Sequence, residues 1–409
     1  MATTPQPFTE LNHCANSKMN MKRIRTNAKL DSFQISRRRT APSNAATRLA
    51  KAVCLAALAS AWVARSATIP DLRKEEASVS GCAEVDSGFE FRPLPNLSGS
   101  KVQAERAATF DPAKGEWPTG MAADERGNLY VALVGLGQIR RLAPDGSATV
   151  FATLPAPGRQ TSASTLGLAF DAAGHLYVTR SSTDAAIHGV WRISPDGKAI
   201  DRFAALPPGF PNALTFDKSG ALYVSDSAHG QMRIWRIDPA GRATLWKNDG
   251  RRDGLEPTSA SGAAFGSTGI AFDQSGKNLY VAGTDQGRIL RIPLNADGTA
   301  GESAIFVESE QLVGADGIAF DTDHGLYVAV NRADRIARIS SQGCIDVIAE
   351  GKPLQYPASI AFGSGKDQGI LFVANLAVME RHGLSMGVPS ATLMKYTMQS
   401  APVISVHHP

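Results

Sequence analysis

The sequence predicts an all-β fold, a six-bladed β-propeller of four-stranded antiparallel blades, preceded by an N-terminal leader. Three observations support this prediction: one pattern recurs six times, its segments alternate apolar and polar residues, and Asp and Gly mark the turns. Successive copies are 47, 46, 56, 48 and 42 residues apart, which is about the length of one four-stranded blade. Equivalent positions in the six copies are held by Thr119, Leu166, Asn212, Thr268, Asp316 and Ala358.

The third copy, Pro211 to Trp246, shows the repeat unit most clearly. Alternating apolar residues predict four strands in it, over residues 214–216, 222–224, 233–237 and 243–246. The turn from Asp217 to Gly220 joins the first two strands, since Asp accepts hydrogen bonds from turn backbone and Gly adopts the left-handed conformation. We therefore interpret the repeated turn carboxylates as structural. In the fifth copy, His324 stands where the other copies have Gly.

Residues 1–67 do not follow the repeat and read as a basic leader and signal peptide. They hold 11 of the 42 Lys and Arg residues and only two of the 38 Asp and Glu residues. The uncharged apolar run Ala52–Ala64 is short for a membrane span but suits a signal-peptide core, with small residues at Ala59-Ser-Ala61 for cleavage. We expect an exported protein, periplasmic or secreted, with no stable membrane span after cleavage. An organelle transit sequence is the alternative interpretation.

The remaining chain is expected to form one domain. Residues 68–109 are an extension expected to close onto the propeller, residues 110–400 are the propeller, and residues 401–409 are a C-terminal tail. Outside the leader, 36 acidic residues outnumber 31 basic ones, so the basic character of the whole chain comes from the leader. We expect no nucleic-acid partner, because such a partner calls for a basic patch interleaved with aromatic residues. We expect a monomer.

Two of the four cysteines, Cys82 and Cys344, lie outside the leader. In an exported protein such a pair permits a disulfide, which would pin the N-terminal extension to the outer strand of the fifth copy. Two unrelated buried thiols are the alternative. No nucleotide-binding, zinc-protease or serine-hydrolase motif occurs in a suitable context.

The candidate site follows from propeller geometry. Residues just before each first strand converge on the central channel at one end, and there Asn212 and Asp316 are the strong oxygen ligands, with Glu116 as a third candidate. Carboxylate and amide oxygens around one point suit a hard divalent cation such as Ca²⁺ or Mg²⁺. Alternatively, these side chains only hydrogen-bond the turning backbone.

The segments from Pro211 to Asp217 and from Ala315 to Asp321, each followed by Leu-Tyr-Val, resemble the senescence marker protein/gluconolactonase family of propellers. NHL-repeat and strictosidine-synthase-like proteins are neighbouring groups. The resemblance implies one axial divalent metal, Ca²⁺ first with Mg²⁺ or Zn²⁺ as alternatives, and hydrolysis of a sugar lactone or related ester. It implies that Asn212 and Asp316 are metal ligands, while Glu116 matches only approximately. The Thr165-Leu-Gly167 segment departs from the family's second-blade Asn-Asp-Gly.

If the protein is such an enzyme, Asp316 is the candidate catalytic base and the substrate is a small molecule such as a lactone. Candidate substrate-binding residues on loops of the same face are Arg159, His229, Asn331 and Arg332. A propeller of the NHL type that binds a ligand or protein without turnover is the competing hypothesis, because fold alone does not decide function.

Overall fold

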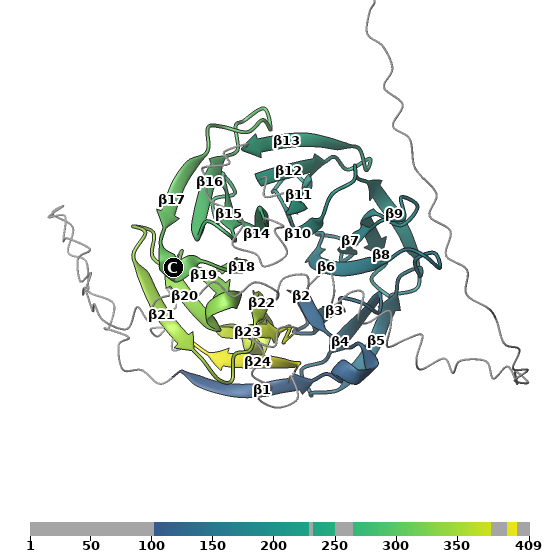
Figure 1. The fold of residues 1–409 in the computed structure, drawn as a ribbon, viewed down its shortest axis with the longest axis horizontal. Helices are drawn as coiled ribbons and strands as arrows, with labels where there is room; N and C mark the ends of the chain where they lie inside the picture. Colours follow the sequence, from purple (N-terminus) through teal and green to yellow (C-terminus); the bar gives the residue numbers. More distant parts are fainter. Residues whose placement is uncertain (1–101, 229–231, 250–264, 378–390, 399–409) are drawn as a thin grey trace, which may run out of the picture. The chain divides into compact units, whose positions relative to one another are not determined.

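The computed structural model describes residues 102–228, 232–249, 265–377 and 391–398, which form six four-stranded antiparallel sheets around a central axis (Figure 1). The predicted six-bladed propeller is therefore confirmed. Residues 1–101 lie outside the described part of the chain, and so do the predicted leader and Cys82. Within the described part, no helix is long and apolar enough to cross a membrane.

The first five blades each run from the axis outward in chain order. The first blade consists of β2 (Pro118–Ala123), β3 (Leu129–Leu133), β4 (Gln138–Leu142) and β5 (Ala148–Thr153). The second consists of β6 (Ala163–Phe170), β7 (Leu176–Ser182), β8 (Gly189–Ile193) and β9 (Ile200–Ala205). The third consists of β10 (Pro211–Phe216), β11 (Leu222–Asp226), β12 (Met232–Ile237) and β13 (Ala243–Asp249).

The fourth blade consists of β14 (Ser267–Phe272), β15 (Asn278–Gly283), β16 (Arg288–Pro293) and β17 (Ala304–Glu308). The fifth consists of β18 (Ala315–Phe320), β19 (Leu326–Val330), β20 (Arg335–Ile339) and β21 (Ile345–Glu350). Short 3-10 helices lie beside the strands, namely η1 (Pro112–Lys114), η3 (Glu310–Leu312), η4 (Asn331–Ala333) and η5 (Gly365–Asp367).

The sixth blade joins the two ends of the described chain. Its inner strands are β22 (Pro357–Phe362), β23 (Ile370–Asn375) and β24 (Thr392–Thr397), and its outer strand is β1 (Gln103–Thr109). Strands β1 and β24 pair antiparallel from Gln103 opposite Thr397 to Thr109 opposite Thr392. The ring is closed by this pairing, since the first strand of the described chain completes the last blade.

Cys344 immediately precedes β21, the outer strand of the fifth blade. It is disulfide-bonded, and its partner lies outside the described residues. The pairing of Cys344 with Cys82 therefore stays a prediction.

The turn carboxylates are structural, as expected. In the third blade, Asp217 Oδ1 accepts hydrogen bonds from the backbone N–H groups of Ser219 at 2.8 Å and Ala221 at 2.9 Å. Gly220 follows with a φ of 82°, and His324 takes the same left-handed conformation in the fifth blade with a φ of 63°. The Asp217 carboxylate therefore stabilises its own turn.

Aromatic side chains hold neighbouring blades together. The Tyr of each Leu-Tyr-Val strand packs edge-to-face against a Phe of the next blade, at 5.0 Å between the ring centroids of Tyr177 and Phe216 and at 5.2 Å for Tyr327 and Phe362. The same contact recurs for Tyr130, Tyr223 and Tyr280. Such pairs stabilise packing by about 0.5–1.5 kcal/mol beyond area burial. One repeated residue thus sets the spacing between blades.

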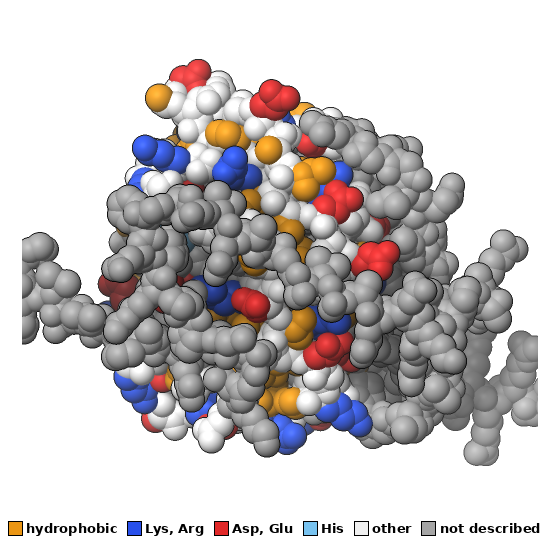
Figure 2. All heavy atoms as spheres, turned by 90° about the vertical axis from the view of Figure 1, so that its left-hand side faces the viewer, with side chains coloured by type: hydrophobic (Ala, Val, Ile, Leu, Met, Phe, Trp, Pro, Cys, Tyr) orange, Lys and Arg blue, Asp and Glu red, His pale blue; other side chains and the backbone are white. Residues whose placement is uncertain are grey.

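The outer rim is mixed in character. Charged side chains of both signs are interspersed with apolar ones over the described surface shown in Figure 2. Four outer strands expose one large apolar residue each, and these residues, 45–48% exposed, are Val150, Leu245, Ile305 and Val347.

The inner strands approach one another so closely that the residue after Leu166 in the second blade and the residue after Thr268 in the fourth blade can only be Gly. A Cβ atom on Gly167 would lie 2.5 Å from the Asn212 carbonyl oxygen, and one on Gly269 would overlap the Asp316 carbonyl oxygen. Because backbone cannot move aside as a flexible side chain can, these glycines allow the six inner strands to form a tight ring.

We expect Gly269→Ala to destabilise the protein by about 3 kcal/mol or more, because the new methyl group would push two inner strands apart. Ala213 is the equivalent residue in the third blade, so Ala213→Gly is the matched control and should lower stability by about 1 kcal/mol or less. Denaturant unfolding of both variants checks this prediction. Equal stabilities for the two variants would contradict it.

Candidate active site

Two sets of equivalent residues, one from each blade, lie at the end of the propeller where the inner strands begin, and we call each set a ring. The first ring consists of the equivalent positions of the six copies, which are the second residue of the inner strand in every blade except the second, where Leu166 is the fourth residue of β6. The second ring lies at the end of each second strand, three residues after the Val of the Leu-Tyr-Val pattern. Its members are Val134, Ser181, Ser227, Thr284, Asn331 and Leu376.

The polar members of the two rings lie together on the third, fourth and fifth blades. Hydrogen bonds link them in pairs: Asn212 with Ser227 at 3.0 Å, Thr268 with Thr284 at 2.9 Å, and Asp316 with Asn331 at 3.1 Å. We call these six residues the polar arc. Blades six, one and two contribute mainly apolar members, namely Ala358, Leu376, Val134 and Leu166. The two rings therefore have a polar side and an apolar side.

Asp316 is the one carboxylate of the polar arc. Its side chain keeps some accessible surface, yet protein surrounds it on most sides, and this burial raises the pKa of Asp316 to about 7. The hydrogen bond from Asn331 and the positive charge of Arg332 act in the opposite direction on this pKa, but burial outweighs them. A carboxyl group of this kind gains and loses a proton near neutral pH, which is what a general base requires.

The polar arc has more acceptor oxygens than donors. Asn331 Nδ2 donates to Asp316, which leaves the buried Asn331 Oδ1 without a partner among the described residues. Asn212 Nδ2 donates to Ser227 Oγ, and no described residue donates a hydrogen bond to Asn212 Oδ1. The Ser227 hydroxyl donates to the Ser267 carbonyl oxygen. Of the Thr268 and Thr284 hydroxyls, one donates to the other and that other donates to the Ala315 carbonyl oxygen. Unpaired carboxylate and amide oxygens suit either a hard cation or the hydroxyl groups of a ligand.

A divalent cation fits this donor set, although with a single formal charge. The described residues include no group of three or more His, Cys, Asp and Glu side chains that could hold a metal ion. A cation on the polar arc would therefore depend on Asp316 and on neutral amide oxygens, which are ordinary ligands for Ca²⁺. The orphaned Asn331 Oδ1 is the observation that supports this fit.

Glu116, the third predicted ligand, has contacts of its own, and no hydrogen bond among the described residues joins it to Asn212 or Asp316. Its Oε1 accepts a hydrogen bond from Arg140 Nη2 at 2.7 Å, and its Oε2 accepts one from the Asp111 backbone N–H at 3.0 Å. Arg140 lies on β4, the third strand outward from the axis. Each carboxylate oxygen of Glu116 therefore has a protein donor, and Thr119 holds the ring position of the first blade.

We therefore expect Glu116→Gln to leave ligand binding at the polar arc unchanged and to lower stability by about 1–2 kcal/mol, because the Arg140 ion pair is lost. Cation titration and denaturant unfolding of the purified variant check both expectations. A loss of cation binding with unchanged stability would place Glu116 at the metal instead.

The predicted substrate-binding residues fall into separate places. Asn331 belongs to the polar arc, and its neighbour Arg332 forms an ion pair with Asp285 of the fourth blade. Arg159 is exposed on the loop between β5 and β6. His229 lies outside the described residues.

Tyr356 is a site residue that the sequence reasoning missed. It precedes β22 with a φ of 51°, a left-handed value that a bulky aromatic residue rarely adopts, and its backbone N–H donates to Asp334 Oδ1 at 2.8 Å. Burial raises its pKa, and the negative charge of Asp316 raises it further. The phenol therefore stays protonated as a donor near Asp316. An aromatic residue before the Pro of a first strand, as also at Trp117 and Phe210, is the signal in the sequence.

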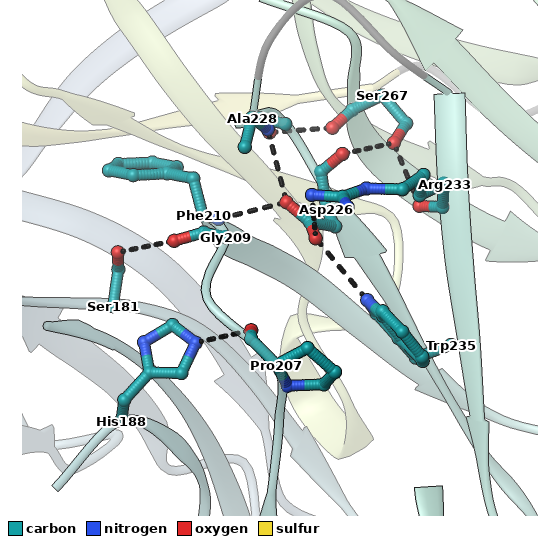
Figure 3. A network of polar contacts seen from close by, with 11 residues as sticks. Ser181, His188, Pro207, Gly209, Phe210, Asp226, Ala228, Arg233, Trp235 and Ser267 are labelled. Carbon is teal, nitrogen blue, oxygen red and sulfur yellow. Dashed lines mark hydrogen bonds and ion pairs between the residues drawn. The ribbon is translucent and has the colours of Figure 1, made fainter. Parts of the chain in front are cut away.

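The chain entering β10, which carries Asn212, is fixed by a polar network (Figure 3). Asp226 accepts hydrogen bonds from the Phe210 N–H at 2.8 Å and from Trp235 Nε1 at 3.3 Å, and it forms an ion pair with Arg233 at 2.7 Å. His188 Nε2 lies 3.0 Å from the Pro207 carbonyl oxygen. These contacts hold the entry to the third blade in place.

The chain is similar to known proteins in sequence pattern and in fold. The family model described as "SMP-30/Gluconolactonase/LRE-like region" matches residues 96–179 and 211–377. A comparison with curated proteins found no match.

Several solved structures share the fold. A luciferin-regenerating enzyme superposes with a TM-score of 0.58 at 15% identity, covering 73% of this chain and 96% of its own. Regucalcin from Agrobacterium tumefaciens, described as a calcium-binding protein, has a TM-score of 0.54 at 18% identity, covering 74% and 97%. A gluconolactonase from Xanthomonas campestris has a TM-score of 0.52 at 16% identity, covering 73% and 90%. At these sequence identities the superpositions show a shared fold and nothing more.

Proposed function

We propose that this chain, which belongs to the SMP-30/gluconolactonase/LRE-like family, hydrolyses a sugar lactone or a related ester at the polar arc. The observation that carries the proposal is Asp316, a partly accessible carboxyl group of the polar arc whose pKa burial raises to about 7. The gluconolactonase and regucalcin among the structural neighbours agree with a lactone substrate and a divalent cation.

In the proposed reaction, Asp316 acts as general base. Its carboxylate takes a proton from a water molecule as the water oxygen attacks the ester carbonyl carbon. The ring C–O bond then breaks, and the leaving oxygen takes the proton back from Asp316, so that lactone and water become one hydroxy acid. Asn331 holds one carboxylate oxygen through its hydrogen bond and leaves the other free to accept the proton.

Neighbouring side chains would bind the substrate and stabilise charge. The protonated Tyr356 phenol is a donor for the oxygen that becomes negative during attack. Arg332, fixed by Asp285, adds positive charge beside Asp316. The free acceptor Asn212 Oδ1 suits a sugar hydroxyl group, and the apolar side of the channel suits the carbon face of the ring.

Asp316, Asn331 and Asn212 would hold the divalent cation, Ca²⁺ first with Mg²⁺ or Zn²⁺ as alternatives, and the bound ion would polarise the ester carbonyl. We expect Ca²⁺ to raise the melting temperature of chelator-treated protein, because only the folded state assembles these oxygens. Differential scanning calorimetry with each cation measures this effect. Asp316→Asn should abolish the response and Glu116→Gln should keep it. A parent protein that responds to no cation would exclude the metal from the proposal.

A further inference from the structure

Arg180, on β7 of the second blade, is a buried cation without a carboxylate partner. Its side chain is 2% exposed, and its Nε and Nη1 atoms have no hydrogen-bond partner. No carboxylate of the described residues forms an ion pair with it. Burial lowers the pKa of Arg180 to about 10, so the guanidinium group is still charged at neutral pH.

Other unpaired polar atoms belong to Thr165, which is the strand partner of Arg180, and to Gln138, which follows a glycine that contacts the guanidinium group. Thr165 pairs with Arg180 across β6 and β7, and its buried Oγ1 has no partner. Gly137 of the first blade lies against the guanidinium, since a Cβ atom on it would lie 3.0 Å from Arg180 Nη1. The next residue, Gln138, has a buried Oε1 that is also without a partner. We call Gln138, Thr165 and Arg180 the blade-one seam.

The third blade shows how a charge at this strand position is normally compensated. Asp226 occupies in β11 the register that Arg180 occupies in β7, two residues after the Val of the repeat. Asp226 is 1% exposed, but Arg233, Trp235 and backbone N–H groups satisfy its oxygens (Figure 3). The blade-one seam contains no corresponding counter-charge among the described residues.

A buried charge without a partner destabilises a folded protein strongly, so such groups are normally paired. The planar guanidinium fork matches a carboxylate, which accepts two parallel hydrogen bonds from it. The Thr165 hydroxyl can donate to the same carboxylate, and Gln138 Oε1 can accept from a hydroxyl group beside it. The unpaired atoms of the seam therefore match a hydroxycarboxylate.

We propose that the blade-one seam binds the carboxylate of a small hydroxy acid, with Arg180 as its counter-charge. The ligand belongs to the chemical class that lactone hydrolysis releases, but binding at the seam does not require that the protein be a hydrolase. The carboxylate can come from a ring-opened lactone, which also carries hydroxyl groups, or from a simple carboxylic acid without them. Comparing a hydroxy acid with a simple carboxylate distinguishes these two sources.

The test is thermal unfolding of the full chain in sodium gluconate, sodium acetate or the uncharged polyol sorbitol, at constant ionic strength set by a bulky buffer anion. Gluconate at about a hundredfold excess over its dissociation constant should raise the melting temperature by about 5 °C. Sorbitol should not raise it comparably. Arg180→Met should remove the gluconate response, whereas Arg192→Met, a change in an exposed ion pair of the same blade, should keep it.

A response to gluconate alone supports a hydroxycarboxylate ligand, and a response to both anions supports any free carboxylate. Equal responses of the parent and Arg180→Met, or no response of the parent, would overturn the proposal. If Arg180→Met does not fold, NMR of the arginine Nε–H groups of the parent protein takes the place of the unfolding comparison. The Arg180 Nε–H signal, assigned as the signal that is missing in Arg180→Lys, should shift when gluconate is added. An Arg180 signal that does not shift would refute binding. Failure of lactone hydrolysis would leave this result untouched.

Discussion

Replacing Asp316 by Asn should lower kcat/KM for lactone hydrolysis by about 10²–10⁴-fold, because the substitution removes the proposed general base. The side chains are nearly the same size, and the amide can still hydrogen-bond Asn331, so the loss would reflect chemistry rather than packing. Asp201→Asn is the matched control, since Asp201 forms a surface ion pair on the second blade. We expect the control to keep the parent rate. Equal rates for the two variants would contradict the role of Asp316.

The same substitution should stabilise the cation-free protein above pH 7. Asp316 has an ordinary pKa of 3.8 in the unfolded chain and a raised pKa of about 7 in the fold. Between these values the unfolded state is ionised while the folded state holds its proton, so stability falls as pH rises. Above pH 7 the buried carboxylate lowers the free energy of unfolding by its full amount, at most about 4 kcal/mol. Asp316→Asn would remove this destabilisation. Denaturant unfolding at pH 5 and pH 8 measures this difference, and a variant less stable than the parent at pH 8 would contradict the burial of an unpaired carboxylate.

Removing β1 should have the largest effect on the fold. The strand is the outer strand of the sixth blade, hydrogen-bonded along β24, and the Phe110 N–H that follows it donates to the Ala391 carbonyl oxygen at 2.9 Å. Phe110 is itself 7% exposed and packs in the cluster between the sixth and first blades. We expect loss of most of the folding free energy, which is typically about 5–15 kcal/mol, in a chain that begins at residue 111.

A chain that begins at residue 102 is the control for this truncation, because it keeps β1 and lacks only residues outside the described part. Circular dichroism during heating compares the two proteins. The shorter chain should lose cooperative unfolding or melt far below the longer one. Indistinguishable melting curves would show that ring closure by β1 does not stabilise the propeller.

The sequence predicts the fold well because each blade repeats the same local physics. Alternating apolar residues define the strands, Asp and Gly define the turns, and the spacing defines the blade, so six copies reinforce one interpretation. The predicted second strand of the third copy, residues 222–224, lies within β11. Even the exception at His324 follows the repeat, since it adopts the left-handed conformation of the Gly it replaces.

The site is predicted less completely because it depends on contacts between copies. Repeat register alone places Asn212 and Asp316 in the same ring, whereas Glu116 lies off register and its Arg140 partner is 24 residues away. Tyr356 is identified by its unusual backbone angle. Arg180 is identified because no counter-charge accompanies it among the described residues. Neither property is visible in a pattern of residue types, since both arise only when neighbouring blades pack together.

The most direct test of the central claim is a pH-stat assay of lactone ring opening by the purified protein with Ca²⁺ present. Hydrolysis converts a neutral lactone into an ionised hydroxy acid and releases one proton, so the consumption of base reports turnover directly. We predict steady base consumption with the parent protein and none above the spontaneous rate with Asp316→Asn. A folded parent that consumes no base with any of a panel of sugar lactones, in the presence of Ca²⁺, Mg²⁺ or Zn²⁺, would contradict the assignment of the polar arc as a hydrolytic site.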